Sequence, residues 1–168
     1  PRAVAVNPEA SLAVRVNEED HLRMQCLMSG LSGQEAYERV DRLDDQLSER
    51  LHFAFDPVYG YLTSCPANVG TGLRVSVMLH LPALVMTRHI EKVFRAVYEM
   101  RMAVRGFYGE GTEAYGELYQ ISNQVTIGRS EQDIIDDMEA VISAIIHYEE
   151  KARNELVTTE RSQLEDRV

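Results

Sequence analysis

Alternation of apolar and polar residues with a period of two constrains the fold of this chain more than any other feature of its sequence. The alternation runs through four segments, at residues 11–17, 21–28, 73–81 and 100–105. A period of two is that of a β-strand with one buried face. Shorter strands are expected at residues 60–63 and 118–121. We therefore expect an α+β fold, mainly an antiparallel sheet flanked by helices, in a single domain over residues 1–168.

Three segments carry helix signals. Ser32 followed three residues later by Glu35 is a capping box. Behind it, apolar residues recur at helical spacing, at Val40, Leu43, Leu47 and Leu51. A second helix is expected from residue 84 or 87 to residue 100. The last helix is capped by Ser130 with Asp133 and should bury one apolar face, made of Ile134, Met138, Val141, Ile142 and Ile145.

Composition argues against several classes of protein. The 168 residues carry a formal net charge of −10, which disfavours a nucleic-acid or anionic-membrane surface, because binding to phosphates needs a basic face. The two cysteines, Cys26 and Cys65, form neither a disulfide framework nor a metal-ligand spacing, which favours a reducing cytoplasm. No apolar run approaches the roughly 18 residues of a membrane span, and no signal-peptide pattern is visible. The chain begins at Pro1 rather than Met, as expected for a piece of a longer protein.

One stretch has the composition of a functional site. Residues 63–74 place Cys65 directly before a proline and an Asn/Gly/Thr/Gly turn rich in backbone donors, and they end at Arg74, at the head of an apolar strand. This arrangement is more particular than a core position needs. Cys26, in contrast, lies on the apolar side of its strand, so we interpret it as a buried structural thiol.

Three arginines, Arg23, Arg74 and Arg105, lie on three expected strands, each on the side opposite the apolar residues. If those strands share a sheet, the three guanidinium groups converge on one non-core face. Converging cations repel one another unless an anion lies between them, and a polyphosphate is the natural candidate. The alternative is that each arginine lies alone at a sheet surface and pairs with a nearby Glu or Asp.

Five acids fall in loops beside these strands, namely Glu18, Glu19, Asp20, Glu110 and Glu113. Near phosphate-binding arginines, carboxylates hold Mg²⁺ or position a cationic nucleophile. Otherwise they are ordinary loop acids. The sequence has no Gly-x-x-x-x-Gly-Lys-Ser/Thr phosphate loop, which excludes that common route to nucleotide binding. His80 and His89 have no neighbours at metal-ligand spacing.

Four separated motifs occur in order along the chain: residues 16–23 (VNEEDHLR), residues 65–74 (CPANVGTGLR), Arg105-Gly106 with Gly109-Glu110, and Ile121-Ser122-Asn123. Together they resemble the motifs of the ATP:guanidino phosphotransferases, or phosphagen kinases, the family of creatine kinase and arginine kinase. The resemblance runs from about Leu12 to Glu150. It implies the catalytic-domain fold of that family, which is similar to that of glutamine synthetase. It also implies that residues 1–168 are the C-terminal portion of such a domain, incomplete at both ends.

The resemblance also implies a role for each motif residue. Arg23, Arg74 and Arg105 match arginines that hold the phosphates of ATP, and Ser122 and Asn123 are assigned to the nucleotide as well. Glu19 and Glu110 match carboxylates that grip the acceptor guanidinium, and Cys65 matches the reactive cysteine beside it.

These residue types suit phosphoryl transfer to a guanidinium. That group has a pKa above about 12 and delocalised lone pairs, so it is a poor nucleophile until acids fix its plane and draw off a proton. Transfer of the γ-phosphoryl of ATP needs in-line geometry and neutralisation of the migrating charge, which arginines and Mg²⁺ supply. Cys65 as a thiolate adds a negative charge near the substrate cation. A covalent phosphocysteine is not implied.

Within the family, the chain is most similar to the bacterial branch that phosphorylates arginine side chains of proteins, on residues 77–82, 108–111 and 122–126. This branch implies protein substrates bearing arginine, an activator protein and a Clp protease system. It also implies a role in cytoplasmic protein quality control, with no nucleic-acid or membrane partner. A homodimer is compatible with it.

Two other functions stay open, a small-molecule guanidino (arginine) kinase and a catalytically silent anion-binding or interaction module on the same fold. The first survives because much of the acceptor pocket is expected upstream of this chain, which should leave the isolated chain with an incomplete active site. The sequence also departs from the family pattern. Met78 replaces a histidine of creatine and arginine kinases, with His80 two residues on and on the same face. Ala67 replaces a serine that creatine kinases have near the cysteine.

Overall fold

The computed structural model describes residues 1–106 and 115–159, which fall into two compact units. The first unit comprises residues 1–74 and 125–135, and the second comprises residues 75–124 and residues from 136 on. Antiparallel strands and helices make up the described chain, which confirms the α+β prediction. The expectation of a single domain stays a prediction.

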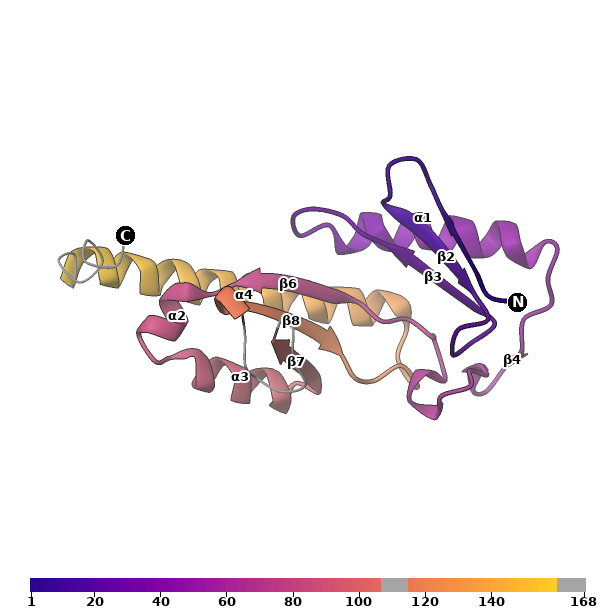
Figure 1. Cartoon of the computed structure of the whole chain (residues 1–168). Coiled ribbons are helices and arrows are strands. Elements are labelled where there is room, and N and C mark those ends of the chain that lie inside the picture. The colour runs from indigo at the N-terminus through magenta and orange to yellow at the C-terminus, as the bar shows by residue number, and fades with distance from the viewer. Residues whose placement is uncertain (107–114, 160–168) are drawn as a thin grey trace. The chain divides into compact units, whose positions relative to one another are not determined.

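The first unit contains a three-stranded antiparallel sheet of β1 (Ala3–Val6), β2 (Leu12–Val16) and β3 (Leu22–Cys26), in that order (Figure 1). Two of the predicted strands are therefore confirmed, and they pair as a hairpin with Arg15 opposite Arg23. Cys26 is only partly buried, so the expectation that it is a core thiol is wrong.

Helix α1 (Gly33–Ser48), which contacts β3, begins where the sequence predicts but without the expected capping box. The hydroxyl of Ser32 donates to the carbonyl of Ser29 (3.3 Å) and caps no helical N–H. Glu35 instead accepts a hydrogen bond from Arg39, one turn further on (2.7 Å). The helix ends earlier than the apolar spacing predicts, so Leu51 lies beyond it and is 43% exposed.

A short hairpin of β4 (Phe55–Asp56) and β5 (Gly60–Tyr61) follows α1. The carboxylate of Asp56 accepts hydrogen bonds from two following backbone N–H groups, at 2.7 and 3.0 Å, and so closes the turn. The hydroxyl of Tyr61 donates to Asp44 of α1 (3.0 Å), which ties the helix to the hairpin. Burial and this carboxylate raise the pKa of Tyr61 to about 12.

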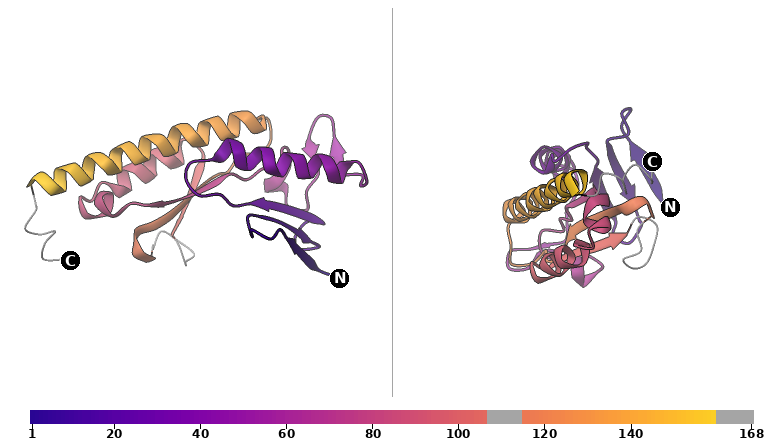
Figure 2. Two further views of the ribbon diagram at one scale, coloured as in Figure 1. Left: turned by 90° about the horizontal axis from the view of Figure 1, so that it is seen from above. Right: turned by 90° about the vertical axis from the view of Figure 1, so that its left-hand side faces the viewer.

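The second unit contains a sheet in the order β6-β8-β7, with all neighbours antiparallel. Its strands are β6 (Ser76–His80), β7 (Met102–Gly106) and β8 (Leu118–Asn123), and the 3-10 turn η2 (Tyr115–Glu117) precedes β8. Two helices pack on it, α3 (Ile90–Glu99) and the part of α4 (Glu131–Thr159) that follows residue 135. Figure 2 shows α4 running alongside α3.

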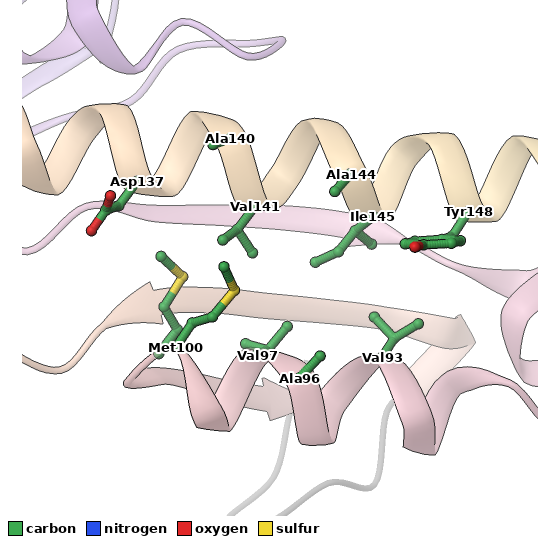
Figure 3. A pocket seen from close by; sticks show the side chains of 11 residues that line it. Val93, Ala96, Val97, Met100, Asp137, Ala140, Val141, Ala144, Ile145 and Tyr148 are labelled. Atoms are coloured by element: carbon green, nitrogen blue, oxygen red, sulfur yellow. The ribbon is translucent and has the colours of Figure 1, made fainter.

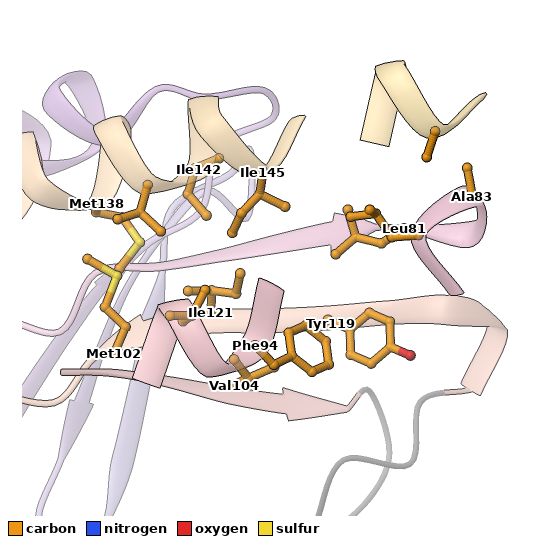
Figure 4. Packing of buried hydrophobic residues seen from close by; sticks show 14 of the residues in the cluster. Leu81, Ala83, Phe94, Met102, Val104, Tyr119, Ile121, Met138, Ile142 and Ile145 are labelled. Atoms are coloured by element: carbon orange, nitrogen blue, oxygen red, sulfur yellow. The ribbon is translucent and has the colours of Figure 1, made fainter. Parts of the chain in front are cut away.

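The hydrophobic core of the second unit lies between one face of this sheet and these two helices (Figure 4). The central strand β8 contributes Ile121, which is fully buried, and Tyr119, whose ring meets Phe94 of α3 edge-on at 4.9 Å between centroids. Each side chain of this size contributes about 1.5–3 kcal/mol when fully buried. The predicted apolar face of the last helix is confirmed, since Ile134, Met138, Val141, Ile142 and Ile145 are all buried.

The single helix expected after Pro82 is in fact two helices, α2 (Pro82–Met86) and α3. Between them Arg88 adopts a left-handed backbone conformation with a φ of 58°. The N–H of His89 then reaches back to the carbonyl of Leu84 (2.9 Å). This is a geometry that ends helices. No Gly or Asn marks the break in the sequence, so the expectation of a continuous helix from residue 84 is wrong, whereas the alternative start at residue 87 lies close to that of α3.

A buried carboxylate stabilises the start of α2. Glu149 of α4 is 4% exposed, and it accepts hydrogen bonds from the backbone N–H groups of Ala83 (3.1 Å) and Leu84 (3.0 Å). It also accepts a hydrogen bond from Nε of Arg153 (2.7 Å). The first N–H groups of a helix have no acceptor within the helix. Glu149 therefore supplies the acceptors for two N–H groups of α2 that water cannot reach.

Helix α4 begins with the capping box that the sequence predicts. The hydroxyl of Ser130 accepts from the N–H of Asp133 (3.1 Å), and the carboxylate of Asp133 accepts from the N–H of Ser130 (3.2 Å). These hydrogen bonds hold the pKa of Asp133 below its ordinary value. The helix continues to Thr159, past residue 152, where the sequence turns polar.

Candidate functional site

The turn between β2 and β3 carries the first motif. Asn17 adopts a left-handed backbone conformation with a φ of 56°. Its N–H donates to the carbonyl of His21 (2.9 Å), which closes the turn. Three successive acids follow Asn17 in this turn, and the second of them, Glu19, is exposed to solvent.

Arg23, next to this turn on β3, pairs with Glu18 at 3.3 Å, and Glu18 also pairs with Arg15 at 3.3 Å. The hydrogen bond from Arg23 is the main reason why the pKa of Glu18 is lowered. This pairing is the alternative that the sequence left open for the arginines. Because both partners are well exposed, the ion pair is weak, and a phosphate group can replace Glu18 at Arg23 at little cost.

Cys65 begins the 3-10 turn η1 (Pro66–Asn68), in a loop held by its own backbone. The carbonyl of Cys65 accepts from the N–H of Asn68 (3.0 Å) and from the hydroxyl of Thr63 (2.7 Å). The thiol is partly buried. Cys65 therefore lies at the start of an ordered turn.

Thr126 holds this loop from a distant part of the sequence. Its buried hydroxyl lies within hydrogen-bond distance of the carbonyls of Ala67 (3.0 Å) and Val69 (2.8 Å). Its own carbonyl accepts from the N–H of Thr71 (3.0 Å). Gly70 has a φ of 114°, and a Cβ at this position would collide with the carbonyl of Thr126. The close approach of the two backbones therefore requires a glycine.

A hydrogen bond joins the acidic turn to the cysteine loop. The backbone N–H of Ser64 donates to Oδ1 of Asp20 at 2.6 Å. Asp20 follows Glu19, and Ser64 precedes Cys65, so this bond brings together the segments that carry two of the residues predicted from the family resemblance. Asp20 appeared in the sequence only as one loop acid among five.

The other predicted residues lie on or near the β6-β8-β7 sheet. Arg105 of β7 and Met78 of β6 both pair with Gln120 of the central strand, so these three residues form a row across the sheet. Met78 and His80 are both exposed, which confirms that they share one face of β6. Ser122 is only 1% exposed, although it lies in the register of this same face.

Arg74 lies just before β6 rather than within it. The residue that follows it, Val75, is held by Asn123 through two hydrogen bonds. The side-chain oxygen of Asn123 accepts from the N–H of Val75 (2.8 Å), and the N–H of Asn123 donates to the carbonyl of Val75 (3.3 Å). Asn123 therefore orders the backbone that leads out of Arg74, a contact that its assignment to the nucleotide did not anticipate.

The three arginines do not share one sheet. Arg23 belongs to the β1-β2-β3 sheet and Arg105 to the β6-β8-β7 sheet, while Arg74 precedes β6. The condition for their convergence on a single sheet face is therefore not met. Glu110 and Glu113 lie outside the described residues. Thr126 was missed as a site residue, although its position three residues after Asn123 of the fourth motif could have drawn attention to it.

The described residues suit a nucleotide better than a metal held by protein alone. Within residues 1–106 and 115–159, no three His, Cys, Asp or Glu side chains are grouped closely enough to hold a metal ion. Mg²⁺ commonly binds through one or two carboxylates, waters and the phosphates of a nucleotide, so a magnesium nucleotide needs no such group. The exposed guanidinium groups of Arg23 and Arg105 match the geometry of phosphate oxygens. In the same residue ranges, no helix is long and apolar enough to cross a membrane.

A separate cleft of about 400 Å³ lies between α3 and α4 (Figure 3). Alanine, valine, isoleucine and methionine side chains line most of it, with Tyr148 at one end and Asp137 at the other. A guanidinium acceptor and a polyphosphate both need several charged partners. This cleft offers a single carboxylate and no cation, so it is not the candidate active site.

The chain belongs to the family of ATP:guanido phosphotransferases, because its residues 1–152 match the model of the C-terminal catalytic domain of that family. This confirms the resemblance given by the four motifs. A protein-arginine kinase from Symbiobacterium thermophilum is 52% identical over 167 residues, or 99% of this chain and 47% of that protein. A protein-arginine kinase from Caldanaerobacter subterraneus subsp. tengcongensis is 51% identical over 163 residues, or 97% of this chain and 48% of that protein.

The chain thus spans about half the length of the curated relatives it matches. Among solved structures, a lombricine kinase aligns with a TM-score of 0.81 at 28% identity, over 91% of this chain and 43% of that one. A duplicated taurocyamine kinase from Schistosoma mansoni, with bound transition-state analogue components, aligns with a TM-score of 0.75 at 32% identity. That alignment covers 88% of this chain and 20% of the other. These neighbours confirm the phosphagen-kinase catalytic-domain fold.

Proposed function

We propose that the protein carrying this chain is a protein-arginine kinase, which transfers the γ-phosphoryl group of ATP to the guanidinium of arginine side chains in proteins. The observation that carries the choice of acceptor is the identity of 51–52% to relatives named protein-arginine kinase, over 97–99% of the chain. The joined segments of Glu19 and Cys65 support the same reaction.

In this proposal Glu19 of the first motif and Cys65 of the second motif have different tasks. Glu19 is exposed at the turn and accepts hydrogen bonds from the acceptor guanidinium, which fixes its plane and withdraws a proton from it. Cys65 adds negative charge beside the same cation and stabilises it without forming a bond to phosphorus. Glu110 is the second carboxylate of the pair.

Arg23, Arg74 and Arg105 bind phosphate oxygens and balance the charge of the migrating group. Ser122 and Asn123, at the end of β8, keep the backbone beside the nucleotide ordered. ATP is the phosphoryl donor, and Mg²⁺ bound to its phosphates neutralises developing charge. Arg23 must exchange Glu18 for phosphate, which the exposure of that ion pair favours.

The acceptor is tested by offering the protein ATP with either free L-arginine or casein, and by measuring acid-labile phosphoarginine with ³¹P NMR and mass spectrometry. Phosphorylation of casein arginines, with little of free arginine, is the expected result. Transfer to free arginine alone would favour a small-molecule guanidino kinase. That second candidate is supported by the fold similarity to lombricine and taurocyamine kinases.

The role of Glu110 is tested by the variant Glu110→Ala. Transfer should be abolished while ATP binding, measured by calorimetry, stays nearly intact, because the carboxylate acts on the acceptor. Equal loss of transfer and of ATP binding would assign Glu110 a structural role. If the wild-type protein transfers phosphate from ATP to neither casein nor free arginine, a catalytically silent module is favoured.

The proposal extends to the setting of the reaction. The resemblance to the bacterial branch supports a cytoplasmic enzyme of protein quality control that works with an activator protein and a Clp protease, and it is compatible with a homodimer. Pull-down of the protein with and without ATP, followed by identification of bound proteins, tests these partners. Recovery of neither a protease subunit nor an activator under both conditions would contradict this part of the proposal.

A further inference from the structure

Three consecutive acids in the β2–β3 turn have three different surroundings. Glu18 is paired with Arg15 and Arg23, both at 3.3 Å. Asp20 accepts the backbone N–H of Ser64 at 2.6 Å. Glu19, between them, is exposed and has neither an ion pair nor a hydrogen bond to any residue of the described chain. The turn therefore fixes the acids on both sides of Glu19 and leaves Glu19 itself available.

The backbone of the turn sets the directions in which the side chains of these three acids point. Asn17 enters it with a φ of 56°, and the N–H of Glu18 donates to the carbonyl of Asp20 (3.1 Å). The side-chain oxygen of Asn17 also lies 3.0 Å from Nδ1 of His21. These bonds fix the backbone of Asp20 and so the direction in which its side chain leaves the turn, toward Ser64.

The bond between Asp20 and Ser64 is the kind that positions a loop. A carboxylate that accepts a backbone N–H forms a charge-assisted bond, shorter and stronger than one between neutral groups. It joins residues that are 44 positions apart in the sequence. On its other side the cysteine loop is held by Thr126, so the loop is bonded from two directions.

We propose that Asp20 is a positioning residue, which holds the Cys65 loop against the turn that presents Glu19 and so sets the position of the thiol relative to that carboxylate. The inference rests on the proposed kinase function. In this role Asp20 acts on the loop rather than on the acceptor, since its Oδ1 is bonded to the N–H of Ser64. It acts through the backbone, one residue before Cys65.

The test compares Asp20→Ala, which removes the acceptor, with Asp20→Asn, whose amide oxygen can still accept the N–H of Ser64. For Asp20→Ala we expect kcat to fall about 10- to 100-fold, the scale expected for a misplacement of about 1 Å. KM for ATP should stay within about twofold, because the phosphate-binding arginines are not bonded to Asp20. Asp20→Asn should restore most of kcat. The matched control is Asp45→Ala, which removes an exposed acid from α1 and should leave kcat unchanged.

Two readouts do not depend on activity. Hydrogen exchange at the Ser64 amide should become at least about tenfold faster in Asp20→Ala and return toward the wild-type rate in Asp20→Asn. In a Cys26→Ser background, alkylation of Cys65 by iodoacetamide should change in rate in Asp20→Ala but not in Asp45→Ala. These measurements test the positioning even if the proposed function is wrong, in which case the wild-type protein itself transfers no phosphate.

The inference is overturned if Ser64 exchange and Cys65 alkylation in Asp20→Ala equal those of the wild type. It is also overturned if the wild type is active and kcat of Asp20→Ala lies within twofold of it. If Asp20→Ala does not fold, Asp20→Asn decides, since an intact hydrogen bond predicts protection of Ser64 in that variant. If the Ser64 amide is not protected from exchange in Asp20→Asn, the hydrogen bond between Asp20 and Ser64 is contradicted.

Discussion

Replacing Glu149 with alanine should destabilise the second unit more than any other single change of a charged residue described above. The carboxylate accepts the N–H groups of Ala83 and Leu84, which are 3% and 2% exposed, so water cannot replace it. A hydrogen bond to a charged group contributes about 1.5–3 kcal/mol. Two lost bonds therefore give a decrease in unfolding free energy of about 3–6 kcal/mol.

Glu149→Gln separates charge from geometry. The amide keeps one acceptor oxygen but turns an NH₂ group toward the second backbone N–H, so about half of the loss is expected, roughly 1.5–3 kcal/mol. Arg153 adds less, because its side chain is 53% exposed. Glu150→Ala is the matched control on the same helix. Its exposed carboxylate should change the unfolding free energy by no more than about 0.5 kcal/mol.

Urea unfolding followed by circular dichroism gives these free energies, and hydrogen exchange of the Ala83 and Leu84 amides gives a local measure. Exchange of both amides should accelerate in Glu149→Ala before global unfolding is approached. A loss below about 1 kcal/mol, or a loss equal to that of Glu150→Ala, would refute the reasoning. It would mean that the start of α2 finds other acceptors once the carboxylate is gone.

The remaining predictions concern the candidate site and one helix cap. Cys65→Ser should slow phosphoryl transfer at least about tenfold, and intact mass spectrometry during turnover should detect no phosphorylated thiol in the wild type; a phosphocysteine would overturn the electrostatic role. Thr126→Val should lower the unfolding free energy by about 1–2 kcal/mol, because the carbonyls of Ala67 and Val69 lose their donor, and Thr126→Ser should restore it; equal stability of the two variants would contradict the role of the hydroxyl. Asp133 has a lowered pKa in the folded chain, so its contribution to stability is complete above its ordinary pKa near about 4 and disappears as the pH falls through the lower folded value. The difference in Tm between wild type and Asp133→Asn should therefore shrink from pH 6 to pH 2, and a constant difference would contradict the cap.

Local pattern was enough to predict most strands and one helix cap. The burial of β6 alternates residue by residue as its period-two pattern requires, with Met78 and His80 outside. Ser130 caps α4 as predicted, whereas Ser32 fails at α1 because its hydroxyl bonds to Ser29 instead. Both serines have an acid three residues later, so the motif alone cannot tell which backbone the hydroxyl will find.

The sequence pattern could not predict contacts between residues that lie far apart in the chain. The period-two alternation placed Arg23 and Arg105 on the non-core sides of their strands. It could not predict that these strands belong to different sheets. The motifs predicted Glu19 and Cys65 as site residues through the family resemblance. The bond between Asp20 and Ser64 spans 44 positions, and nothing in the local composition of either segment indicates the other.

The dependence of the cysteine loop on Thr126 also has a consequence for the order in which the protein matures on the ribosome. Val69 precedes Thr126 by 57 positions. At about 5–20 residues per second, synthesis takes roughly 3–11 s to cover that distance. During this interval the nascent chain can complete the β2–β3 hairpin and its acids, but it cannot yet form the hydrogen bonds through which Thr126 holds the carbonyls of Ala67 and Val69. The turn that carries Glu19 is therefore complete first, and the growing chain carries a cysteine loop without its Thr126 contacts until that residue has emerged.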